Sequence, residues 1–374
     1  MRGPAGRIRM ETANEKKTAV LVALSGGVDS SVALLLLKRL GHDVAGATMK
    51  LWDYADVGGN PHHDGRCCDL ETINNARAVC DALGAAHYVF DFTQRFKEVV
   101  IGDFVSEYRS GRTPNPCIVC NTEIKWRLFL ERARQIGYNA IATGHYARTG
   151  YDPRTGRCYL KRAVDDSRDQ SYALWGIDQD GLRRTFFPLG ELTKIETRRT
   201  AAEAGLKTAD IADSMEICFV ADNRYERFVR EWTGEEIPPG DIVDSSGAVI
   251  GRHKGIPFYT IGQRRGLGIA HPTPLYVWAI DAVNNRIVVG EKGDAHRKEM
   301  TVSRVNWVSI PPAQEPLSAQ VKIRYQHTAQ PATVIPDGAD RVTVTFEAAQ
   351  PAVTPGQSAV IYDGDVVLAG GIID

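Results

Sequence analysis

The chain has 374 residues, which is too long for one compact core of ordinary size, so we expect two or three domains. Its hydrophobic fraction of 43% and charged fraction of 24% are those of an ordinary globular protein, and no apolar stretch is long enough to cross a bilayer. The formal net charge of -1 carries no global signature of nucleic-acid binding, so any such role must rest on local clusters.

The N-terminal residues and the cysteines indicate the compartment. Residues 1–17 are basic but lack the apolar core of an export signal, so we expect a disordered leader on a cytoplasmic protein that has no membrane partner. Seven cysteines in a chain that is not exported favour buried, catalytic or metal-bound thiols over a disulfide framework.

Strand-like and helix-like segments alternate from residue 18 to about 145, with glycines ending the helices. This alternation predicts a doubly wound α/β domain with a parallel sheet. The expected strands are 19–24, 44–49, 87–92 and 140–143, and the expected helices are 30–40, 71–83 and 123–135.

The residue pattern changes after residue 222, where proline, glycine and short β-rich runs dominate. We expect two smaller β-rich domains there, the last of them a β-barrel. The predicted division is a leader at 1–17, a catalytic domain at 18–222, a central RNA-binding domain at 223–298 and a C-terminal barrel at 299–374.

Local clusters of basic residues are the candidates for contacts with nucleic acid. Each cluster taken alone is more often a solvated face than a binding site. The four clusters are Arg183–Arg184, Lys194–Arg199, Arg252–Lys254 and Arg264–Arg265.

The strongest local motif is Ser25–Ser31, with the sequence SGGVDSS, between an expected strand and an expected helix. Gly26 and Gly27 allow close backbone approach, so consecutive N–H groups can hold a pyrophosphate at the positive end of the helix dipole. The motif lacks the lysine of a Walker loop, which favours cleavage between the α and β phosphates of ATP. A plain strand-to-helix turn with a well-capped helix is the alternative. SGGxDS resembles the signature of the ATP pyrophosphatase (PP-loop) superfamily, which adenylates several kinds of substrate.

Three cysteines bear on the choice among these substrates. Cys117 and Cys120 form a C-x-x-C that suits a redox pair or half of a metal site. We expect Cys120 to precede a helix that begins near Glu123, where the helix dipole and Lys125 would lower its pKa. Cys218 lies between Ile217 and Phe219, so a buried core cysteine is its default interpretation.

From about residue 18 onward the motifs closely resemble the bacterial tRNA-specific 2-thiouridylase family, MnmA or TrmU. The resemblance rests on several segments that occur in the family's order. Besides the phosphate loop, these are Gly46–Trp52, the run GRTPNPCIVCNTEIKW, Ala142–Tyr146, Asp169–Tyr172, the segment around Cys218 and Tyr259–Gly268.

This resemblance implies the residues of a site. Each residue could instead have a purely structural role, such as a core histidine at His145 or a polar turn at Asp169–Ser171. For ATP the resemblance implies Ala23, Leu24, Ser25, Gly26, Gly27, Val28, Asp29, Ser30, Met49 and Gly144. For the target uracil it implies Asn115, Pro116 and Cys117, and for the rest of the tRNA it implies His145, Asp169, Gln170, Ser171, Arg324, Tyr325 and Gln357.

The implied reaction is thiolation of the wobble uridine in glutamate, glutamine and lysine tRNAs. ATP with Mg²⁺ adenylates O2, and sulfur then replaces that oxygen at C2. Cys218 would carry a persulfide from a cysteine desulfurase or a sulfur-relay protein, and Cys120 would release the sulfur and leave a disulfide. The uridine would be unstacked or flipped out of the anticodon loop to reach the site.

Cys117 departs from the family pattern, because many members have Asp at this position. Cys117, Cys120 and Cys218 could together hold a [4Fe–4S] cluster whose open iron binds hydrosulfide, so free sulfide would be the donor. Two other functions remain open on the residues alone. One is a PP-loop ligase that adds an amine to an adenylated base, and the other is an RNA-binding relative without turnover.

Overall fold

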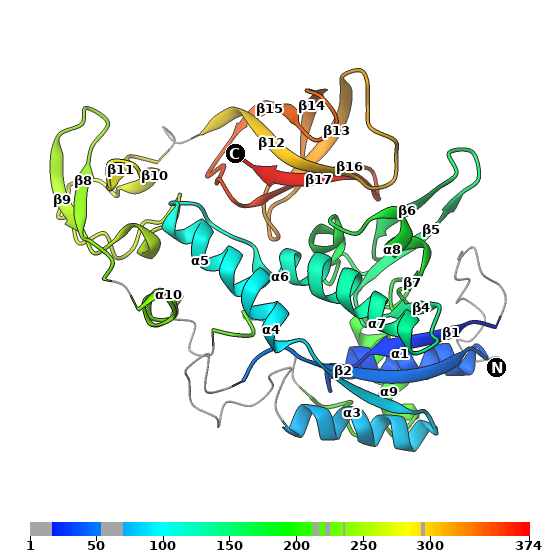
Figure 1. The fold of residues 1–374 in the computed structure, drawn as a ribbon. Helices are drawn as coiled ribbons and strands as arrows, with labels where there is room; N and C mark the ends of the chain where they lie inside the picture. Colours follow the sequence, from blue (N-terminus) through cyan, green and yellow to red (C-terminus); the bar gives the residue numbers. More distant parts are fainter. Residues whose placement is uncertain (1–16, 54–69, 212–216, 221–224, 235, 293–295) are drawn as a thin grey trace.

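The computed structural model describes residues 17–53, 70–211, 217–220, 225–234, 236–292 and 296–374. The predicted leader at 1–17 lies outside this range except for its last residue. The described strands form a five-stranded, a four-stranded and an eight-stranded sheet, which follow one another along the chain apart from one hairpin (Figure 1).

The five-stranded sheet is parallel throughout, as predicted from the alternating pattern. Its strands run in the order β3-β2-β1-β4-β7. Alternate residues of the central strand β1 face two different apolar cores, because successive side chains point to opposite sides of a sheet. The strands are β1 (Ala19–Ala23), β2 (Asp43–Lys50), β3 (His87–Asp91), β4 (Ala140–Ala142) and β7 (Thr185–Phe186).

Helices cover both faces of this sheet, which confirms the doubly wound α/β class (Figure 1). On one face lie α1 (Val28–Arg39), α3 (Leu70–Leu83) and α9 (Lys194–Glu203). On the other face lie α4 (Thr93–Phe96), η2 (Lys97–Ile101), α5 (Gly102–Arg109), α6 (Pro116–Val119), η3 (Cys120–Leu128) and α7 (Phe129–Gln135). Shorter helices in this part of the chain are η4 (Ser171–Leu174) and α8 (Gln179–Arg183).

The helix expected to begin near Glu123 begins earlier, at Pro116, and the prediction of its start was wrong. Proline at the first position of a helix has no N–H to leave unsatisfied, so Asn115-Pro116 is a better start signal than the polar residues at 121–123. The run continues through a π-helical segment from Cys120 to Leu128. Cys120 therefore lies inside the helical run and not ahead of it, as the sequence had suggested.

The central part of the chain forms the four-stranded sheet, in the order β10-β11-β8-β9. Its core is small and is built around Ile242, Val277 and Ile287. The elements are α10 (Tyr225–Thr233), β8 (Gly240–Val243), β9 (Val249–His253), η5 (Ile256–Phe258), β10 (Tyr276–Asp281) and β11 (Arg286–Gly290).

The C-terminal strands close into a six-stranded antiparallel barrel, which confirms the predicted barrel. The order is β12-β15-β14-β13-β16-β17, and β12 pairs with β17 to close it. Its strands are β12 (Arg297–Trp307), β13 (Leu317–Lys322), β14 (Gln330–Pro336), β15 (Val342–Gln350), β16 (Ser358–Asp363) and β17 (Val366–Ile373).

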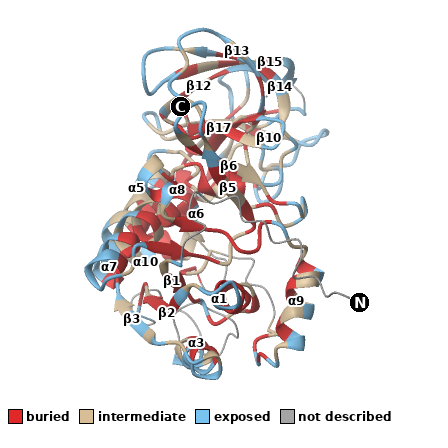
Figure 2. Cartoon of the chain, turned by 90° about the vertical axis from the view of Figure 1, so that its right-hand side faces the viewer, coloured by how far each residue is buried: buried red, intermediate tan, exposed pale blue. Residues whose placement is uncertain are grey.

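A hairpin from the catalytic part joins the barrel to the rest of the chain. Its strands are β5 (Ala147–Asp152) and β6 (Arg157–Arg162), and β6 pairs with β17. The Tyr172 hydroxyl donates to the Ser358 carbonyl at 2.8 Å across this junction, and Trp175 packs against Gly370. Figure 2 shows buried residues running without a break from α6 and α8 towards β17. No helix in the described ranges is long and apolar enough to span a bilayer.

Gly46 and Gly102 form a matched pair for testing this packing. A Cβ at Gly46 would overlap the side chain of Leu24 and lie 2.5 Å from Cys80 Sγ. A Cβ at Gly102 would have the Lys97 carbonyl oxygen, at 3.7 Å, as its nearest neighbour beyond the adjoining helical backbone. We predict that Gly46→Ala destabilises the catalytic domain by about 1–3 kcal/mol through overpacking.

Gly102→Ala is the control, because Gly102 has helical backbone angles (φ -58°, ψ -47°), and it should stabilise the domain by roughly 0.5–1 kcal/mol. Urea unfolding followed by tryptophan fluorescence measures both changes. Equal midpoints for the two variants would contradict the packing described around β2.

Candidate active site

The site lies where the strand order of the parallel sheet reverses. β1 and β4 are neighbours, but their connections leave toward opposite sides, and such a point opens a crevice at the carboxyl ends of the strands. Ser25–Gly27 follows β1 and Thr143–His145 follows β4. The topology therefore brings the phosphate loop and the Gly144 segment together.

The phosphate loop is held in shape by its own serines and by a glycine that cannot be replaced. Gly26 has φ +70°, and a Cβ there would lie 2.8 Å from the Thr72 carbonyl oxygen. The Ser30 hydroxyl accepts from the Ser25 N–H at 3.2 Å and donates to the Gly27 carbonyl at 3.2 Å. Since α1 begins at Val28, the loop has the form of an anion site at a helix N-terminus.

Some of the residues predicted to contact ATP are accessible to a ligand, and the others are buried beneath the loop. Ser25 is exposed, and Gly27 and Asp29 are partly exposed at the mouth of the loop. A Cβ on Gly144 would lie 2.7 Å from Ser30 N, so the backbone after β4 packs directly against the start of α1. The remaining predicted residues are buried and support the loop from below, namely Ala23, Leu24, Gly26, Val28, Ser30 and Met49.

Asp29 is the centre of a polar network that sequence reasoning missed. Both of its carboxylate oxygens lie 2.8 Å from Nζ of Lys194, and the Tyr146 hydroxyl donates to Oδ1 at 2.9 Å. Only 10% of the Lys194 side chain is exposed, so this member of the basic cluster 194–199 is no solvated face. The capping box Thr193-x-x-Glu196 is the sequence signal that could have placed Lys194 at the first position of a helix.

The loop before Cys117 is fastened to the barrel. The Gln357 amide donates to the carbonyls of Thr113 and Pro114 at 3.1 and 3.2 Å, and Thr113 N–H donates to the Pro355 carbonyl at 2.9 Å. This arrangement puts Asn115 at the N-cap of α6 and Cys117 in its first turn. Gln357, predicted to contact tRNA, thus positions the loop predicted to meet the target base.

Burial, and after it the charge of Lys125, shifts the pKa values of Cys117 and His145. Burial raises the pKa of the Cys117 thiol above its ordinary value, and the positive charge of Lys125 opposes that rise. Burial lowers the pKa of His145 well below its ordinary value, and Lys125 lowers it further. Cys117 itself is exposed in the first turn of α6.

His145 is further fixed by two neighbours. Its Nδ1 lies 2.8 Å from the Thr143 hydroxyl, and its ring centroid lies 5.6 Å from that of Trp126 on η3. At neutral pH the imidazole is therefore uncharged and held in one orientation. A neutral histidine and a protonated thiol make this surface suitable for an uncharged ligand.

Cys120 and Cys218 belong to the same apolar core, which lies on the face of the sheet covered by α4 to α7. Cys120 is buried and Cys218 is partly buried, and both are free thiols in the structure. Among the described residues, no three His, Cys, Asp or Glu side chains converge as metal ligands. The described conformation therefore does not assemble Cys117, Cys120 and Cys218 into the cluster site expected from the sequence.

The Asp169–Ser171 segment faces inward rather than toward solvent. Asp169 is buried and accepts from the N–H groups of Ala163 and Ser171 at 3.1 Å each, and Gln170 Oε1 accepts from Tyr146 N–H at 2.9 Å. On the barrel, Arg324 is partly exposed and Tyr325 is 45% exposed, with the Tyr325 hydroxyl donating to the Asp169 carbonyl at 3.2 Å. Of these predicted residues, Tyr325 is thus the most accessible, and the buried segment supports it through its hydroxyl.

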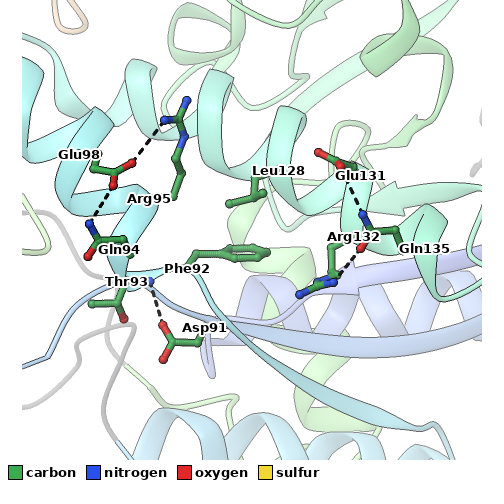
Figure 3. Close-up of a pocket in the computed structure, with 10 residues that line it drawn as sticks. All are labelled: Asp91, Phe92, Thr93, Gln94, Arg95, Glu98, Leu128, Glu131, Arg132 and Gln135. Atoms are coloured by element: carbon green, nitrogen blue, oxygen red, sulfur yellow. Dashed lines mark hydrogen bonds and ion pairs between the residues drawn. The ribbon is translucent and has the colours of Figure 1, made fainter.

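A separate hollow of about 670 Å³ opens beside the end of β3 (Figure 3). Its polar side chains already pair with one another, for example Gln94 with Glu98 at 2.8 Å and Arg132 with Gln135 at 2.7 Å. It does not adjoin the phosphate loop in the strand order, since β2 separates β3 from β1. We therefore place the site at the junction of β1 and β4.

Comparison with known proteins covers nearly the whole chain. Residues 18–222 match the family described as tRNA methyl transferase HUP domain, 226–291 its PRC-barrel domain, and 297–373 the aminomethyltransferase beta-barrel domain. The tRNA-specific 2-thiouridylase MnmA of Clostridioides difficile is 47% identical over 95% of this chain and 98% of its own. The proteins of that name from Geotalea uraniireducens and Carboxydothermus hydrogenoformans are each 46% identical, over 96% and 98% of this chain and 96% and 99% of their own.

The protonation of Cys117 can be tested by alkylation. Because burial raises its pKa, we predict that iodoacetamide modifies Cys117 slowly at pH 7 and faster as the pH rises through 9. Lys125→Met removes the charge that favours the thiolate, so it should shift this profile to higher pH. Peptide mass spectrometry resolves Cys117 from the other cysteines, and half-maximal modification below pH 8 would contradict the placement of this thiol.

Proposed function

The chain belongs to the tRNA-specific 2-thiouridylase family, and from this premise we propose that its phosphate loop uses ATP to adenylate O2 of the wobble uridine before sulfur is placed on C2. The enzyme is accordingly a tRNA-uridine 2-sulfurtransferase that uses ATP through a PP-loop. The observation that carries the adenylation step is the glycine-rich loop at the β1–β4 junction, without a Walker lysine and with Gly144 packed against it.

Adenylation gives the uridine a leaving group that it otherwise lacks. The α-phosphorus forms a bond to O2, pyrophosphate departs, and the proton of N3 is lost to water, so that AMP is later displaced from C2. The carboxylate of Asp29 is the oxygen donor at the loop that suits Mg²⁺, and the ion when bound would offset phosphate charge. In the described structure Lys194 occupies that carboxylate.

The target base fits the surface formed by Asn115, Cys117 and His145. A uracil is uncharged, and so are the protonated thiol and the neutral imidazole at neutral pH. Lys125 supplies the positive charge that stabilises negative charge developing on the base as sulfur adds. Support for this assignment comes from the fastening of the preceding loop by Gln357, since a flipped base needs a fixed receptor.

For the sulfur step we propose the cysteine pair Cys120 and Cys218, which share one core. The terminal sulfur of a Cys218 persulfide bonds to C2 as AMP leaves. The Cys120 thiolate then attacks Cys218 Sγ, which frees the sulfur on C2 and leaves a Cys120–Cys218 disulfide. Two electrons from an external thiol reductant restore both thiols. The persulfide itself would come from a cysteine desulfurase or a sulfur-relay protein.

A [4Fe–4S] cluster on Cys117, Cys120 and Cys218 is the other route considered from the sequence. The described residues do not bring three ligands together, so we derive no step through a cluster. Iron content after anaerobic reconstitution separates the two routes, because a cluster would need all three thiols.

Exposed basic residues on the central sheet support binding of the tRNA body. Arg252, Lys254, Arg264 and Arg265 are all exposed there. We propose that residues 223–298 form a tRNA-binding domain between a catalytic domain at 18–222 and a barrel at 299–374. We further propose glutamate, glutamine and lysine tRNAs as substrates and, because tRNA and ATP meet there, the cytoplasm as the compartment.

Cysteine substitutions test the sulfur step separately from adenylation. We predict that Cys120→Ala and Cys218→Ala abolish 2-thiouridine formation but still release pyrophosphate, because adenylation precedes sulfur transfer, whereas Cys117→Ala keeps part of the turnover. Mass spectrometry of the nucleosides and a pyrophosphate assay measure the two steps with undermodified tRNA and ATP.

Other outcomes of these variants decide against the proposal. Stoichiometric iron that is lost in each cysteine variant, with sulfide as a competent donor, would replace the persulfide route by the cluster. Full 2-thiouridine formation by both Cys120→Ala and Cys218→Ala would exclude this cysteine pair as the sulfur carriers, and an aminated base made without 2-thiouridine by the unmodified chain would favour an amine ligase. Binding of tRNA by the unmodified chain without release of AMP would favour a non-catalytic protein.

Gln357→Leu tests the positioning of the target base. It removes both hydrogen bonds to the 113–114 carbonyls, so we predict that kcat for thiolation falls by roughly 10- to 100-fold while tRNA affinity stays within about 2-fold. Gln330→Leu is the matched control, because the Gln330 amide on the same barrel donates to the local Thr328 carbonyl and not to the 113–114 loop. A loss of tRNA affinity with unchanged kcat would instead make Gln357 a direct RNA contact.

A further inference from the structure

Lys194 reaches the phosphate loop from a distant part of the chain. It is the first residue of α9, 165 positions after Asp29, and its ammonium lies 2.8 Å from each Asp29 carboxylate oxygen. Asp29 belongs to the first turn of α1, directly behind the glycines of the loop. A cation thus stands at the edge of the predicted pyrophosphate site.

The position of this lysine is unfavourable for the helix that carries it. A positive charge at the N-terminus of a helix opposes the helix dipole, and removing an ammonium from water costs further free energy. The structure offsets the charge with Asp29 and fixes the backbone of α9 with two anchors. Thr193 and Glu196 form a capping box, and Lys194 N–H donates to Asp165 Oδ2 at 3.0 Å.

Stability does not explain this arrangement. A buried ion pair is on average no more stabilising than apolar side chains of similar size, because desolvation offsets the attraction. The first turn of α9 could accept an apolar residue at this point, since the Tyr146 ring lies 5.9 Å from Nζ. A charge held against the helix dipole and almost fully buried beside the phosphate loop marks a functional position.

The phosphate loop itself lacks the charge that a pyrophosphate leaving group requires. Ser25–Ser31 contains no basic residue, and its backbone N–H groups offer only partial charges. Lys194 supplies a full charge from another element. Its straight side chain can keep its stem in place while the ammonium exchanges one anionic partner for another.

We propose that Lys194 binds the β,γ-pyrophosphate of ATP, exchanging Asp29 for phosphate oxygens when the nucleotide enters. This role rests on the proposed adenylation. As the α-phosphorus bonds to uridine O2, its bond to the bridging oxygen of the β-phosphate breaks and the electron pair leaves with pyrophosphate. Lys194 stabilises that negative charge. Asp29, released from Lys194, becomes available to a divalent cation.

Binding of ATP and of AMP by Lys194 variants tests this assignment. Lys194→Met should weaken ATP binding by about 10-fold or more and leave AMP binding within about 2-fold, because AMP lacks the β and γ phosphates. Lys194→Arg keeps the charge and should retain part of the ATP affinity. Arg199→Met is the matched control, since Arg199 lies on the same helix with 55% of its side chain exposed, and it should change neither affinity.

Isothermal titration calorimetry with the full chain measures each affinity, and thermal unfolding checks that each variant folds. Equal losses of ATP and AMP affinity would mean that Lys194 only maintains the shape of the loop, and unchanged ATP affinity would also overturn the proposal. If Lys194→Met does not fold, Lys194→Arg decides, because it keeps the positive charge. It should still bind ATP more tightly than AMP and release pyrophosphate more slowly than the unmodified chain. Loss of the selectivity for ATP over AMP would overturn the proposal. Absence of ATP binding in the unmodified chain would instead refute the proposed function itself.

Discussion

Asp29 holds together three segments that are far apart in the sequence. Its carboxylate accepts from Lys194 of α9 and from Tyr146 after β4, while its own backbone abuts Gly144. The phosphate loop, the end of β4 and the start of α9 are thereby fixed relative to one another. A nucleotide that enters this junction meets a preformed site, so little ordering remains to oppose its binding.

The barrel extends this order to the second half of the site. The phosphate loop belongs to the parallel sheet, but the loop before Asn115 depends on Gln357 and Pro355 of the barrel. Arg112 adds a bond from its guanidinium to the Ile373 carbonyl at 3.0 Å, close to the C-terminus. The C-terminal domain therefore holds the segment that we propose meets the base.

Local signals predicted the parts of the fold that depend on neighbours in sequence. A buried strand, two glycines and a helix are sufficient to predict the loop at Ser25–Ser31, and the alternation of elements is sufficient for the parallel sheet. The start of the helix at Pro116 was also readable, but the polar residues near Glu123 were given more weight than proline at the first helical position.

Contacts between side chains far apart in the sequence could not be predicted from local sequence signals. Nothing near residue 194 indicates that its side chain turns inward to Asp29, because a basic stretch has the same composition whether it is solvated or buried. Likewise, the spacing of Cys117 and Cys120 suggested a shared function, but the helical run gives the two residues different environments. Cys117 is exposed and Cys120 is buried in the core.

The two environments suit the two halves of the proposed reaction. The Cys117 thiol and the His145 imidazole are uncharged at neutral pH, and Cys117 is exposed, so an uncharged base can lie beside them before sulfur is transferred. Cys120 is buried in the apolar core against which the partly buried Cys218 packs, so Cys218 is the more accessible of the two to a sulfur donor. In the proposed reaction C2 must carry AMP as a leaving group before sulfur can displace it, so adenylation at the phosphate loop precedes sulfur transfer. The helical run from Pro116 to Gln135 contains both Cys117 and Cys120 and so links the predicted base site to the thiol proposed to release sulfur.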